Sequence, residues 1–556
     1  MRHLFFTLLT VSVSIFLSTT MVAQPFDRGE MYSRQDSLRG SNTPERAWWD
    51  LRHYRLAVWV YPEKQEIEGV NTITYVVKSD HPGRLQIELQ KPMVLEQAVQ
   101  NGKSLSWDQE GMIYFIQLQD EQPVGSRQEL ALTFGGKPKK ARRAPWDGGF
   151  SWTKDDEGNH FIATSNQGEG SSVWWPSKDP PLDEPEEGIT EIFTVPQGLV
   201  AVGNGRLTKT ERDRKNKQVT YTWEVTNPIN DYGININIGD YVNWTETYAG
   251  EKGDLECSYW ALRQNEAEAR EQFKQGSMTL EAMEHWFGPY PFYEDTYKLV
   301  HVPYLGMEHQ SSVTYGNNFG NGYLGRDLSQ TGVGLQFDFI IVHESGHEWF
   351  ANNITHQDVA DMWIHESFTN YSESLFVEYH FGKESGWKYV RGTRSNISND
   401  IPIIGPYNVR REGSGDMYYK GGNMLHTIRQ IINDDEKWRS ILRGLNEDYY
   451  HQTVTSQMVE DYIAEKSGEF LEPVFDLYLR DVRVPTFSYR QTPNGTQYRW
   501  SNVPQDFIMP LDIMVNGEER RIIPTYRWQM LEDVTWDDEL EASVDYYIYQ
   551  EDQTVR

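Results

Sequence analysis

The chain has 556 residues, with 82 acidic and 52 basic side chains that give a formal net charge of −30. Such acidity excludes nucleic acid and anionic membrane surfaces as expected partners, because both are themselves negatively charged. The single cysteine, Cys257, excludes an intrachain disulfide, so a chain of this length must rely on hydrophobic cores in several domains.

The first 23 residues have the order of a secretory signal peptide. Arg2 precedes a short apolar run from Leu4 to Leu17, and Ala23 supplies a small residue at a cleavage point. No later stretch of about 18 apolar residues exists, so we expect no stable membrane insertion after cleavage. The predicted location is the periplasm, cell envelope or exterior of a bacterium. An uncleaved N-terminal anchor is the alternative.

Residues 24–45 are polar and lack periodicity, so we expect a flexible lead-in there. From residue 46 to residue 243, short runs alternate between apolar and polar positions, as in Leu56–Val60 and Ile234–Ile238. Turn signals containing glycine separate these runs. The pattern predicts an N-terminal all-β domain.

Helical periodicity replaces this alternation over residues 244–484. A helical stretch near Glu266–Trp286 opens the region, and one apolar stripe recurs after Gly421, which we expect to be core. Alternating strands return after Pro485, and residues 485–556 predict a small C-terminal β-sandwich. The predicted fold class is therefore multidomain α+β. The stripe consists of Met424, Leu425, Ile428, Ile431 and Ile432.

The helical region contains the run His343-Glu344-Ser345-Gly346-His347. Histidines four positions apart on a helix project from one face, about 6 Å apart at Cβ, and can share a metal ion. Glu344 beside them can reach a water on that metal without being a ligand. A pattern of three fixed positions is weak alone, and a buried helix with two satisfied histidines is the alternative.

A third candidate ligand favours a metal site over a buried helix with two satisfied histidines. Glu366 lies in a second predicted helix, Met362–Tyr371, and follows His347 by 19 positions (366 − 347). Two imidazoles and a carboxylate, with one position open to water, are the ligand set of a catalytic zinc. A metzincin would need glycine and histidine where this chain has Phe350 and Asn353, which excludes that class.

With these residues in view, the chain resembles the zinc aminopeptidases of the aminopeptidase N and leukotriene hydrolase family, the gluzincins. That family has HExxH, eighteen residues and then a glutamate in a W-x-x-E-G-F-like helix, and here HESGHEWF precedes WIHESFTNY. The likeness runs from about residue 45 to residue 480. Further pieces match in order: Thr164–Gln167 (T-Q-x-Q), Trp175–Asp179 (F-P-C-x-D), Leu305–His309 (G-x-M-E-N) and Tyr418–Gly421 (Y-E-K-G).

The resemblance implies a saddle-like N-terminal domain and a thermolysin-like, mostly α catalytic domain holding one zinc ion per chain. It implies that Glu344 is the general base and acid and that Tyr418 stabilises the oxyanion. Tyr419 is an adjacent rival for the second role. Larger members add a helical C-terminal domain over the active site. We expect this chain to be a short, exported type without it, and its cleft to be more open.

The resemblance also assigns the substrate-binding residues. In the G-x-M-E-N-like segment, which we expect to be an edge strand, Gly306, Met307 and Glu308 would bind the substrate, with Glu308 on its free α-ammonium. Gln167 would add a neutral acceptor. The alternatives are a solvated surface acid for Glu308 and a turn residue for Gln167. Glu373, two turns beyond Glu366, is expected to orient a ligand histidine.

Two departures from the family pattern remain. Leu305 and His309 replace the family's glycine and asparagine, so the preferred N-terminal residue stays unpredicted. The leading hypothesis is an exported zinc aminopeptidase acting on peptides with a free N-terminal amine. The alternatives are a zinc endopeptidase, should Glu308 not face the cleft, epoxide hydrolysis at the same zinc, and a non-catalytic binding protein on the same fold.

Overall fold

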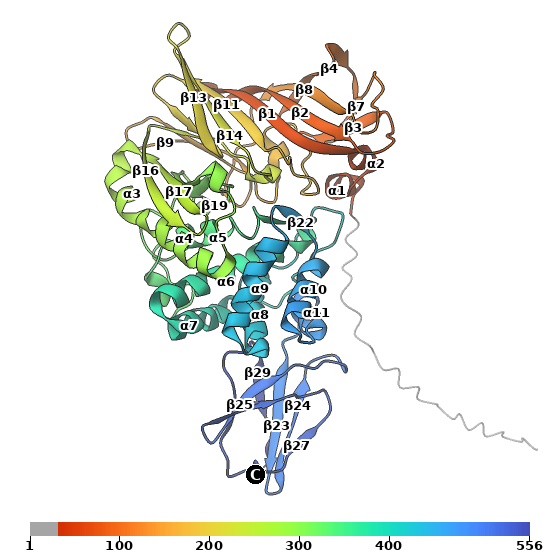
Figure 1. The fold of residues 1–556 in the computed structure, drawn as a ribbon, viewed down its shortest axis with the longest axis vertical. Coiled ribbons are helices and arrows are strands. Elements are labelled where there is room, and N and C mark those ends of the chain that lie inside the picture. The colour runs from red at the N-terminus through yellow and green to blue at the C-terminus, as the bar shows by residue number, and fades with distance from the viewer. Residues whose placement is uncertain (1–31, 556) are drawn as a thin grey trace, which may run out of the picture.

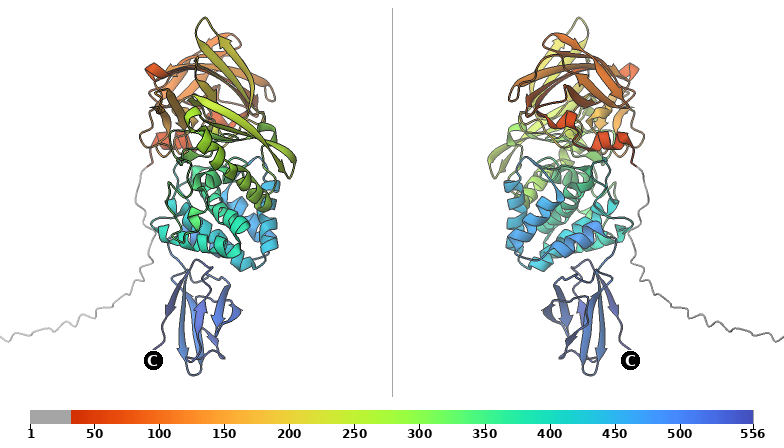
Figure 2. Two further views of the ribbon diagram at one scale, coloured as in Figure 1. Left: turned by 90° about the vertical axis from the view of Figure 1, so that its left-hand side faces the viewer. Right: turned by 90° about the vertical axis from the view of Figure 1, so that its right-hand side faces the viewer.

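The computed structural model describes residues 32–555, so the expected signal peptide at residues 1–23 lies outside the described part. An N-terminal β domain, a helical middle part and a C-terminal β part follow one another along the long axis (Figure 1). Figure 2 shows the same order from both sides. Within residues 32–555 no helix has the length and apolar character needed to cross a membrane. The multidomain α+β fold class is confirmed.

The start of the described chain differs from the expected flexible lead-in at residues 24–45. Two short helices, α1 (Arg34–Gly40) and α2 (Pro44–Ala47), form there. The Ser33 hydroxyl accepts a hydrogen bond from the backbone N–H of Asp36, whose carboxylate binds back to the N–H of Ser33. Leu38 is buried in a small apolar cluster of the β domain. Helix α1 is stabilised by one buried leucine and a capping box, and neither gives a periodic pattern in the sequence.

The N-terminal domain is built around β1 (Trp49–Tyr61), which pairs with β2 (Glu66–Val77) antiparallel and with β11 (Ile189–Pro196) parallel. These strands are central in an eight-stranded sheet ordered β13-β14-β11-β1-β2-β8-β4-β5. A second sheet has the order β12-β15-β10-β9, and a third has the order β3-β7-β6. The remaining strands are β3 (Arg84–Glu88), β4 (Val94–Gln100), β5 (Lys103–Leu105), β6 (Trp107–Glu110), β7 (Ile113–Gln117), β8 (Arg127–Gly136), β9 (Gly149–Lys154), β10 (His160–Ser165), β12 (Val200–Val202), β13 (Arg206–Asp213), β14 (Gln218–Val225) and β15 (Asn237–Gly239).

The middle part opens with a five-stranded sheet ordered β16-β17-β18-β20-β19. Its first strand starts at Tyr241, two residues before the expected end of the β domain, because β16 pairs along its whole length with β17. β19 lies at the edge of the sheet, where an edge strand was predicted. The strands are β16 (Tyr241–Gly250), β17 (Gly253–Leu262), β18 (Tyr297–His301), β19 (Gly306–Met307) and β20 (Val313–Tyr315), with β21 (Ile354–His356) and β22 (Gln452–Val454) pairing apart from them.

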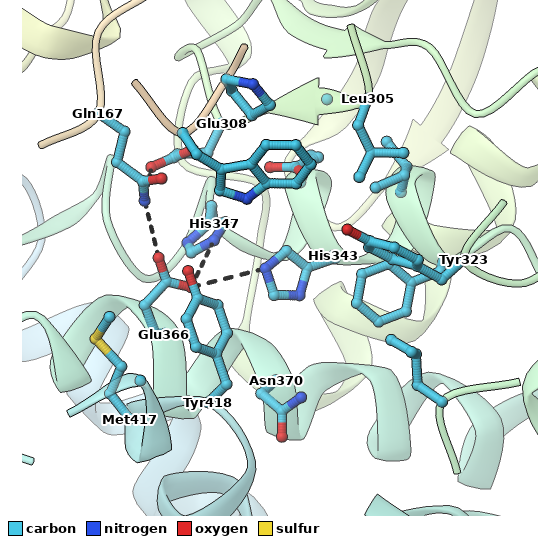
Figure 3. Close-up of a pocket in the computed structure, with 18 of the residues that line it drawn as sticks. Gln167, Leu305, Glu308, Tyr323, His343, His347, Glu366, Asn370, Met417 and Tyr418 are labelled. Carbon is cyan, nitrogen blue, oxygen red and sulfur yellow. Dashed lines mark hydrogen bonds and ion pairs between the residues drawn. The ribbon is translucent and has the colours of Figure 1, made fainter. Parts of the chain in front are cut away.

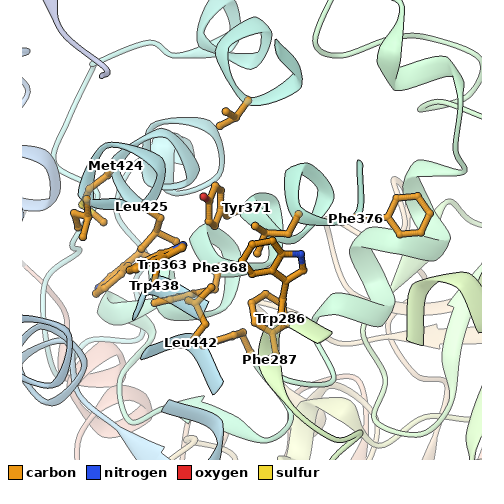
Figure 4. Close-up of a cluster of buried hydrophobic side chains, with 14 of the residues drawn as sticks. Trp286, Phe287, Trp363, Phe368, Tyr371, Phe376, Met424, Leu425, Trp438 and Leu442 are labelled. Atoms are coloured by element: carbon orange, nitrogen blue, oxygen red, sulfur yellow. The ribbon is translucent and has the colours of Figure 1, made fainter. Parts of the chain in front are cut away.

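Helix α6 is the centre of the helical part. Most of its length is buried, and aromatic residues such as Trp363, Phe368 and Tyr371 join it to its neighbours (Figure 4). The apolar stripe predicted as core, from Met424 to Ile432, is buried on α8 against it. A helix so enclosed fixes the position of any side chain it carries. The helices are α3 (Glu266–Gln272), α4 (Lys274–Phe287), α5 (Phe339–Gly346), α6 (Trp363–Phe381), α7 (Lys383–Thr393), α8 (Tyr419–Ile432), α9 (Asp435–Asp448), α10 (Ser456–Ser467) and α11 (Glu472–Arg480).

The C-terminal part has two sheets, ordered β27-β24-β23-β29 and β26-β25-β28. It is anchored to the helical part by buried hydrogen bonds, including one from the backbone N–H of Tyr547 to Thr427 on α8. The strands are β23 (Thr486–Thr492), β24 (Gly495–Ser501), β25 (Leu511–Val515), β26 (Glu518–Ile522), β27 (Gln529–Leu531), β28 (Leu540–Ala542) and β29 (Tyr549–Asp552).

Candidate active site

Two helices bring together the three expected metal ligands. Asp338 caps α5 by accepting hydrogen bonds from two backbone N–H groups of its first turn. His343 lies on that helix and His347 at its end, with ring centroids 5.0 Å apart. The Nε2 atoms of His343 and His347 lie 3.7 Å and 3.4 Å from Oε2 of Glu366 on α6 (Figure 3). All three side chains are buried.

The other ring nitrogens are held by hydrogen bonds that orient both histidines. Nδ1 of His343 lies 2.8 Å from Oε1 of Glu373, and Nδ1 of His347 lies 3.0 Å from the carbonyl oxygen of Phe350. A carbonyl oxygen can only accept, so Nδ1 of His347 carries the proton and Nε2 has the lone pair. Glu373 therefore lies where the sequence placed it, behind a ligand histidine.

The three donor atoms fit a tetrahedral zinc ion. Nitrogen and oxygen ligands about 2.0–2.2 Å from such an ion lie about 3.3–3.6 Å from one another. The observed separations of 3.4 Å and 3.7 Å from Glu366 to the two histidines agree with that spacing. Oε2 of Glu366 is also a buried acceptor without a hydrogen-bond partner among the described residues. A cation held by the two imidazoles would satisfy it.

Glu344 lies beside the ligands, on the wall of a cavity of about 520 Å³. Gly306 of β19 lies directly against it. A Cβ atom at position 306 would meet Oε1 of Glu344 at 3.0 Å and Cγ2 of Ile340 at 2.5 Å. Only glycine lets the strand approach this closely. Burial raises the pKa of the Glu344 carboxyl to about 8, while the neighbouring His343 lowers it.

The two adjacent tyrosines have hydroxyl groups in different electrostatic surroundings. The ring of Tyr418 lies 6.0 Å from the ring of His343, and its hydroxyl points toward Glu366 (Figure 3). Burial, then the negative charges of Glu366 and Glu308, raises the pKa of this hydroxyl well above its usual value, so it stays a donor. The Tyr419 hydroxyl is instead influenced by Glu373. Tyr418 is thus the tyrosine whose hydroxyl faces the ligands.

Glu308 and Gln167 meet on the other side of the ligands. Nε2 of Gln167 donates one hydrogen bond of 2.8 Å to Glu308 and another of 2.8 Å to Oε1 of Glu366 (Figure 3). Both amide hydrogens are then used, and the amide oxygen is left as an acceptor. Glu308 is only 2% exposed. No lysine or arginine is among the described residues that line the cavity.

Met307 differs from the prediction that it binds substrate. Successive side chains of a strand point to opposite faces, so Gly306 and Glu308 face the cavity while Met307 points away. Its side chain packs in a buried cluster with Ala163 and Tyr304. Leu305 lines the cavity, and His309 is buried outside it.

The cavity has further walls that no sequence motif had indicated. Trp146, from a loop of the β domain, and Glu412, from the segment before α8, both line it. Neither belongs to a spacing pattern: Trp146 reaches the cavity through the docking of the two domains, and Glu412 through the fold of the helical domain. The complete lining is Pro145, Trp146, Gln167, Gly168, Leu305, Gly306, Glu308, Tyr323, Leu328, Phe339, Ile340, His343, Glu344, His347, Glu366, Asn370, Glu412, Gly415, Met417, Tyr418 and Tyr419.

Comparison with known proteins finds aminopeptidases among the similar chains. Residues 271–478 match the peptidase family M1 domain. The chain is 20% identical over 497 residues to aminopeptidase 2 of Candida albicans, covering 85% of this chain and 51% of the relative. It is 22% identical over 360 residues to human aminopeptidase B, covering 62% and 50%. The chain thus spans about half the length of these relatives.

Solved structures share the fold. An M1 zinc metallopeptidase from Deinococcus radiodurans superposes with a TM-score of 0.64 at 20% identity, covering 79% of this chain and 94% of that one. A mutant of that enzyme bound to a Tyr-Ser-Ala substrate gives the same TM-score at 19% identity, covering 78% and 95%.

Proposed function

This protein belongs to peptidase family M1, whose domain spans residues 271–478, and from that premise we propose that it is a zinc-dependent aminopeptidase. His343, His347 and Glu366 hold one zinc ion per chain. The substrate is a peptide with a free N-terminal amine, and the product is its first amino acid.

The buried carboxylate of Glu308 is the observation that carries this proposal. It lies beside the metal-ligand set, and among the described residues no lysine or arginine lines the cavity to neutralise it. Burial raises the pKa of the Glu308 carboxyl, so a cation that binds beside it would favour its charged form. The α-ammonium of a peptide is the cation that lies one residue away from a scissile bond. This supports an exopeptidase over an endopeptidase.

Proton transfer is the role of Glu344. When bound, zinc supplies a Lewis acid at the scissile carbonyl and lowers the pKa of a water toward about 7. Glu344 accepts the proton of the water whose oxygen attacks the carbonyl carbon. It returns that proton to the leaving nitrogen as the carbon–nitrogen bond breaks. Its place on the cavity wall, against Gly306, supports this role.

Stabilising the developing oxyanion is the role of Tyr418. The carbonyl oxygen gains negative charge when water attacks, and a fixed hydroxyl donor lowers the barrier. The position of Tyr418 on the cavity wall, with its ring 6.0 Å from the ring of His343, supports this role.

Amine recognition is the role of Glu308 and Gln167. The carboxylate of Glu308 opposes the ammonium charge, and the free amide oxygen of Gln167 accepts one of its hydrogens. Gln167 also bridges Glu308 to Glu366, which fixes the distance between the amine site and the metal. That fixed distance supports removal of one residue at a time.

The proposal is tested by metal content and by a pair of substrates. The purified protein should hold one zinc per chain, lose activity with a chelator, and lose metal in His343→Ala, His347→Ala and Glu366→Ala. It should cleave a free-amine peptide far faster than the N-acetylated twin. Metal and activity retained in all three variants would refute the ligand assignment. Equal cleavage of both peptides would refute the aminopeptidase assignment.

We also propose export, on the order of charged, apolar and small residues in positions 1–23. Expression of the full-length gene in a bacterium, followed by N-terminal sequencing of the exported protein, should give a chain that starts near Gln24. An intact N-terminus on a membrane-bound protein would favour the uncleaved anchor.

A further inference from the structure

One end of the active-site cavity is lined by apolar side chains. Leu305, Tyr323 and Leu328 are partly buried there, because they pack against the core of the helical part and also line the cavity. Phe339 and Ile340 of α5 complete this surface, which we call the apolar wall. Apolar surface that remains open in a cavity favours an apolar group of a ligand, since both then leave water.

A series of contacts separates the apolar wall from the amine site. Gln167 of the amine site donates to Oε1 of Glu366, and Oε2 of Glu366 lies 3.7 Å from Nε2 of His343. The ring of His343 stacks on the ring of Phe339 at 5.2 Å, and the ring of Tyr323 lies 5.4 Å further on. Figure 3 shows Gln167 and Tyr323 on opposite sides of His343. The metal ligands therefore lie between the two ends of the cavity.

The backbone of the apolar wall is held by hydrogen bonds. Tyr323 and Arg326 exchange two backbone hydrogen bonds, of 2.9 Å and 3.1 Å, across a tight turn. Nδ2 of Asn396 donates to the carbonyl oxygen of Leu328 at 2.9 Å. The wall is thus in place before a substrate binds, which lowers the entropy cost of binding a side chain there.

The proposed chemistry places the second residue of the substrate at this wall. Glu344 returns a proton to the leaving nitrogen, which is the backbone nitrogen of that second residue. Gly306 lies directly against Glu344, Leu305 precedes Gly306, and Ile340 lies one helical turn before Glu344 on α5. Consecutive Cα atoms of a peptide lie about 3.8 Å apart, so the second side chain starts about 5 Å from the amine nitrogen. A second residue within reach of Glu344 therefore lies beside Leu305 and Ile340.

We propose that the apolar wall binds the side chain of the substrate's second residue, with Leu305 as a specificity-determining residue, so that the enzyme prefers peptides with an apolar residue at that position. The proposal rests on the proposed aminopeptidase function, because the amine site sets the direction of the peptide. Leu305 stands where the family pattern has glycine, so its side chain is a feature of this chain. Only Tyr323 carries a polar group in the wall, and a polar second side chain would lose hydrogen bonds to water there.

Two tripeptides, Ala-Leu-Ala and Ala-Asn-Ala, test the proposal. They share their first residue, so the contacts of the amine cancel in the comparison, and leucine and asparagine have nearly the same shape. Burial of the leucine side chain should make kcat/KM for release of the first alanine about 10- to 100-fold higher for Ala-Leu-Ala. The pair Leu-Ala-Ala and Asn-Ala-Ala measures the preference at the first position in the same assay.

Leu305→Asn and Leu328→Asn should each lower the second-position preference about 3- to 10-fold, because each replaces part of the wall with an amide of similar shape. The preference at the first position should equal that of wild type. Leu324→Asn is the matched control, since Leu324 is an exposed leucine of the same loop that does not line the cavity. It should keep the full second-position preference. Zinc content equal to wild type shows an intact site, and Leu328→Asn decides the matter if Leu305→Asn loses zinc.

The outcomes separate this proposal from the function on which it rests. Equal cleavage of Ala-Leu-Ala and its N-acetylated twin by wild type would overturn the aminopeptidase function itself. A wild type that requires the free amine but cleaves Ala-Leu-Ala and Ala-Asn-Ala equally would overturn the role of the wall alone. Full second-position preference in both Leu305→Asn and Leu328→Asn would do the same. A change at the first position instead would show that the wall binds the first side chain, which also contradicts the proposal.

Discussion

The metal half and the amine half of the cavity are built in different ways. His343, His347, Glu366 and Glu373 come from two consecutive helices, α5 and α6, of one domain. The amine half joins residues far apart in the chain: Gln167 lies 141 positions from Glu308 and 199 from Glu366. Helix geometry alone aligns the first set, whereas the second exists only when the β domain docks against the helical domain.

This difference assigns a separate task to each half. In the proposed mechanism the metal half, with Glu344 and Tyr418 beside the ligands, holds the groups that make and break bonds, and all of these residues lie within the M1 match at residues 271–478. The amine half contributes charge and distance but no reacting atom. Damage to the metal half should therefore affect every substrate, and damage to the amine half should affect only substrates with a free amine.

Glu344→Gln should have the largest effect. The amide cannot carry the proton from water to the leaving nitrogen, so kcat should fall by up to about 10⁴-fold while zinc stays bound. The loss should be the same for free and acetylated peptides. Glu348→Gln, a buried glutamate one turn further that does not line the cavity, is the control and should retain turnover. If Glu344→Gln retained turnover, Glu344 would not be the general base.

Tyr418→Phe should have the second-largest effect, a loss of about 10²–10³ in kcat with nearly unchanged substrate affinity. This is the usual cost of one oxyanion donor. Tyr419→Phe is the matched control, because the pKa of its hydroxyl is raised by burial and then by Glu373, without a contribution from the ligand Glu366. Should Tyr419→Phe be the damaging change instead, the choice between the two tyrosines is reversed.

Glu373→Gln should lower the affinity for zinc without changing the preference for free-amine substrates. The carboxylate lies 2.8 Å from Nδ1 of His343, and loss of such a partner commonly reduces metal affinity about 10- to 100-fold. Competition with a zinc chelator measures this affinity directly. At saturating zinc, the ratio of free-amine to acetylated cleavage should equal that of wild type. A changed ratio would mean that the two halves are coupled.

Gln167→Ala should give the smallest effect, about tenfold in kcat/KM for free-amine peptides. The lost interaction is a hydrogen bond from the ammonium to a neutral amide oxygen, which Glu308 partly replaces. Acetylated peptides should be cleaved at the wild-type rate. Equal losses on both substrates would show that Gln167 supports the metal through its bond to Glu366.

The difference between residues aligned by one helix pair and residues joined by domain docking also explains which parts of the site the sequence could predict. The histidine spacing and the helix around Glu366 identified the metal half, because helical periodicity fixes which side chains share a face. Alternation likewise predicted the strands of the first and last domains. Glu308 and Gln167 were assigned only through the resemblance to a known family. Substrate binding by Met307 stays a prediction, although the alternation of β19 turns its side chain out of the cavity.

Other features had no signal in the sequence. Trp146 reaches the active-site cavity only through the docking of a β-domain loop, a contact between distant positions that no local pattern encodes. The helix at residues 34–40 was missed for a related reason. A single buried leucine and a capping pair hold it, and neither gives a periodic pattern long enough to detect.

Glu308→Ala, assayed on a free-amine peptide and its N-acetylated twin, tests the division between the two halves most directly. Removing one partner of a buried charge pair costs about 3–5 kcal/mol, so kcat/KM for the free-amine peptide should fall by roughly two to four powers of ten. Cleavage of the acetylated peptide should stay at its wild-type rate, and the ratio between the two should collapse toward unity. An equal fall on both peptides would contradict the account, because Glu308 would then serve the chemistry rather than the recognition of the amine.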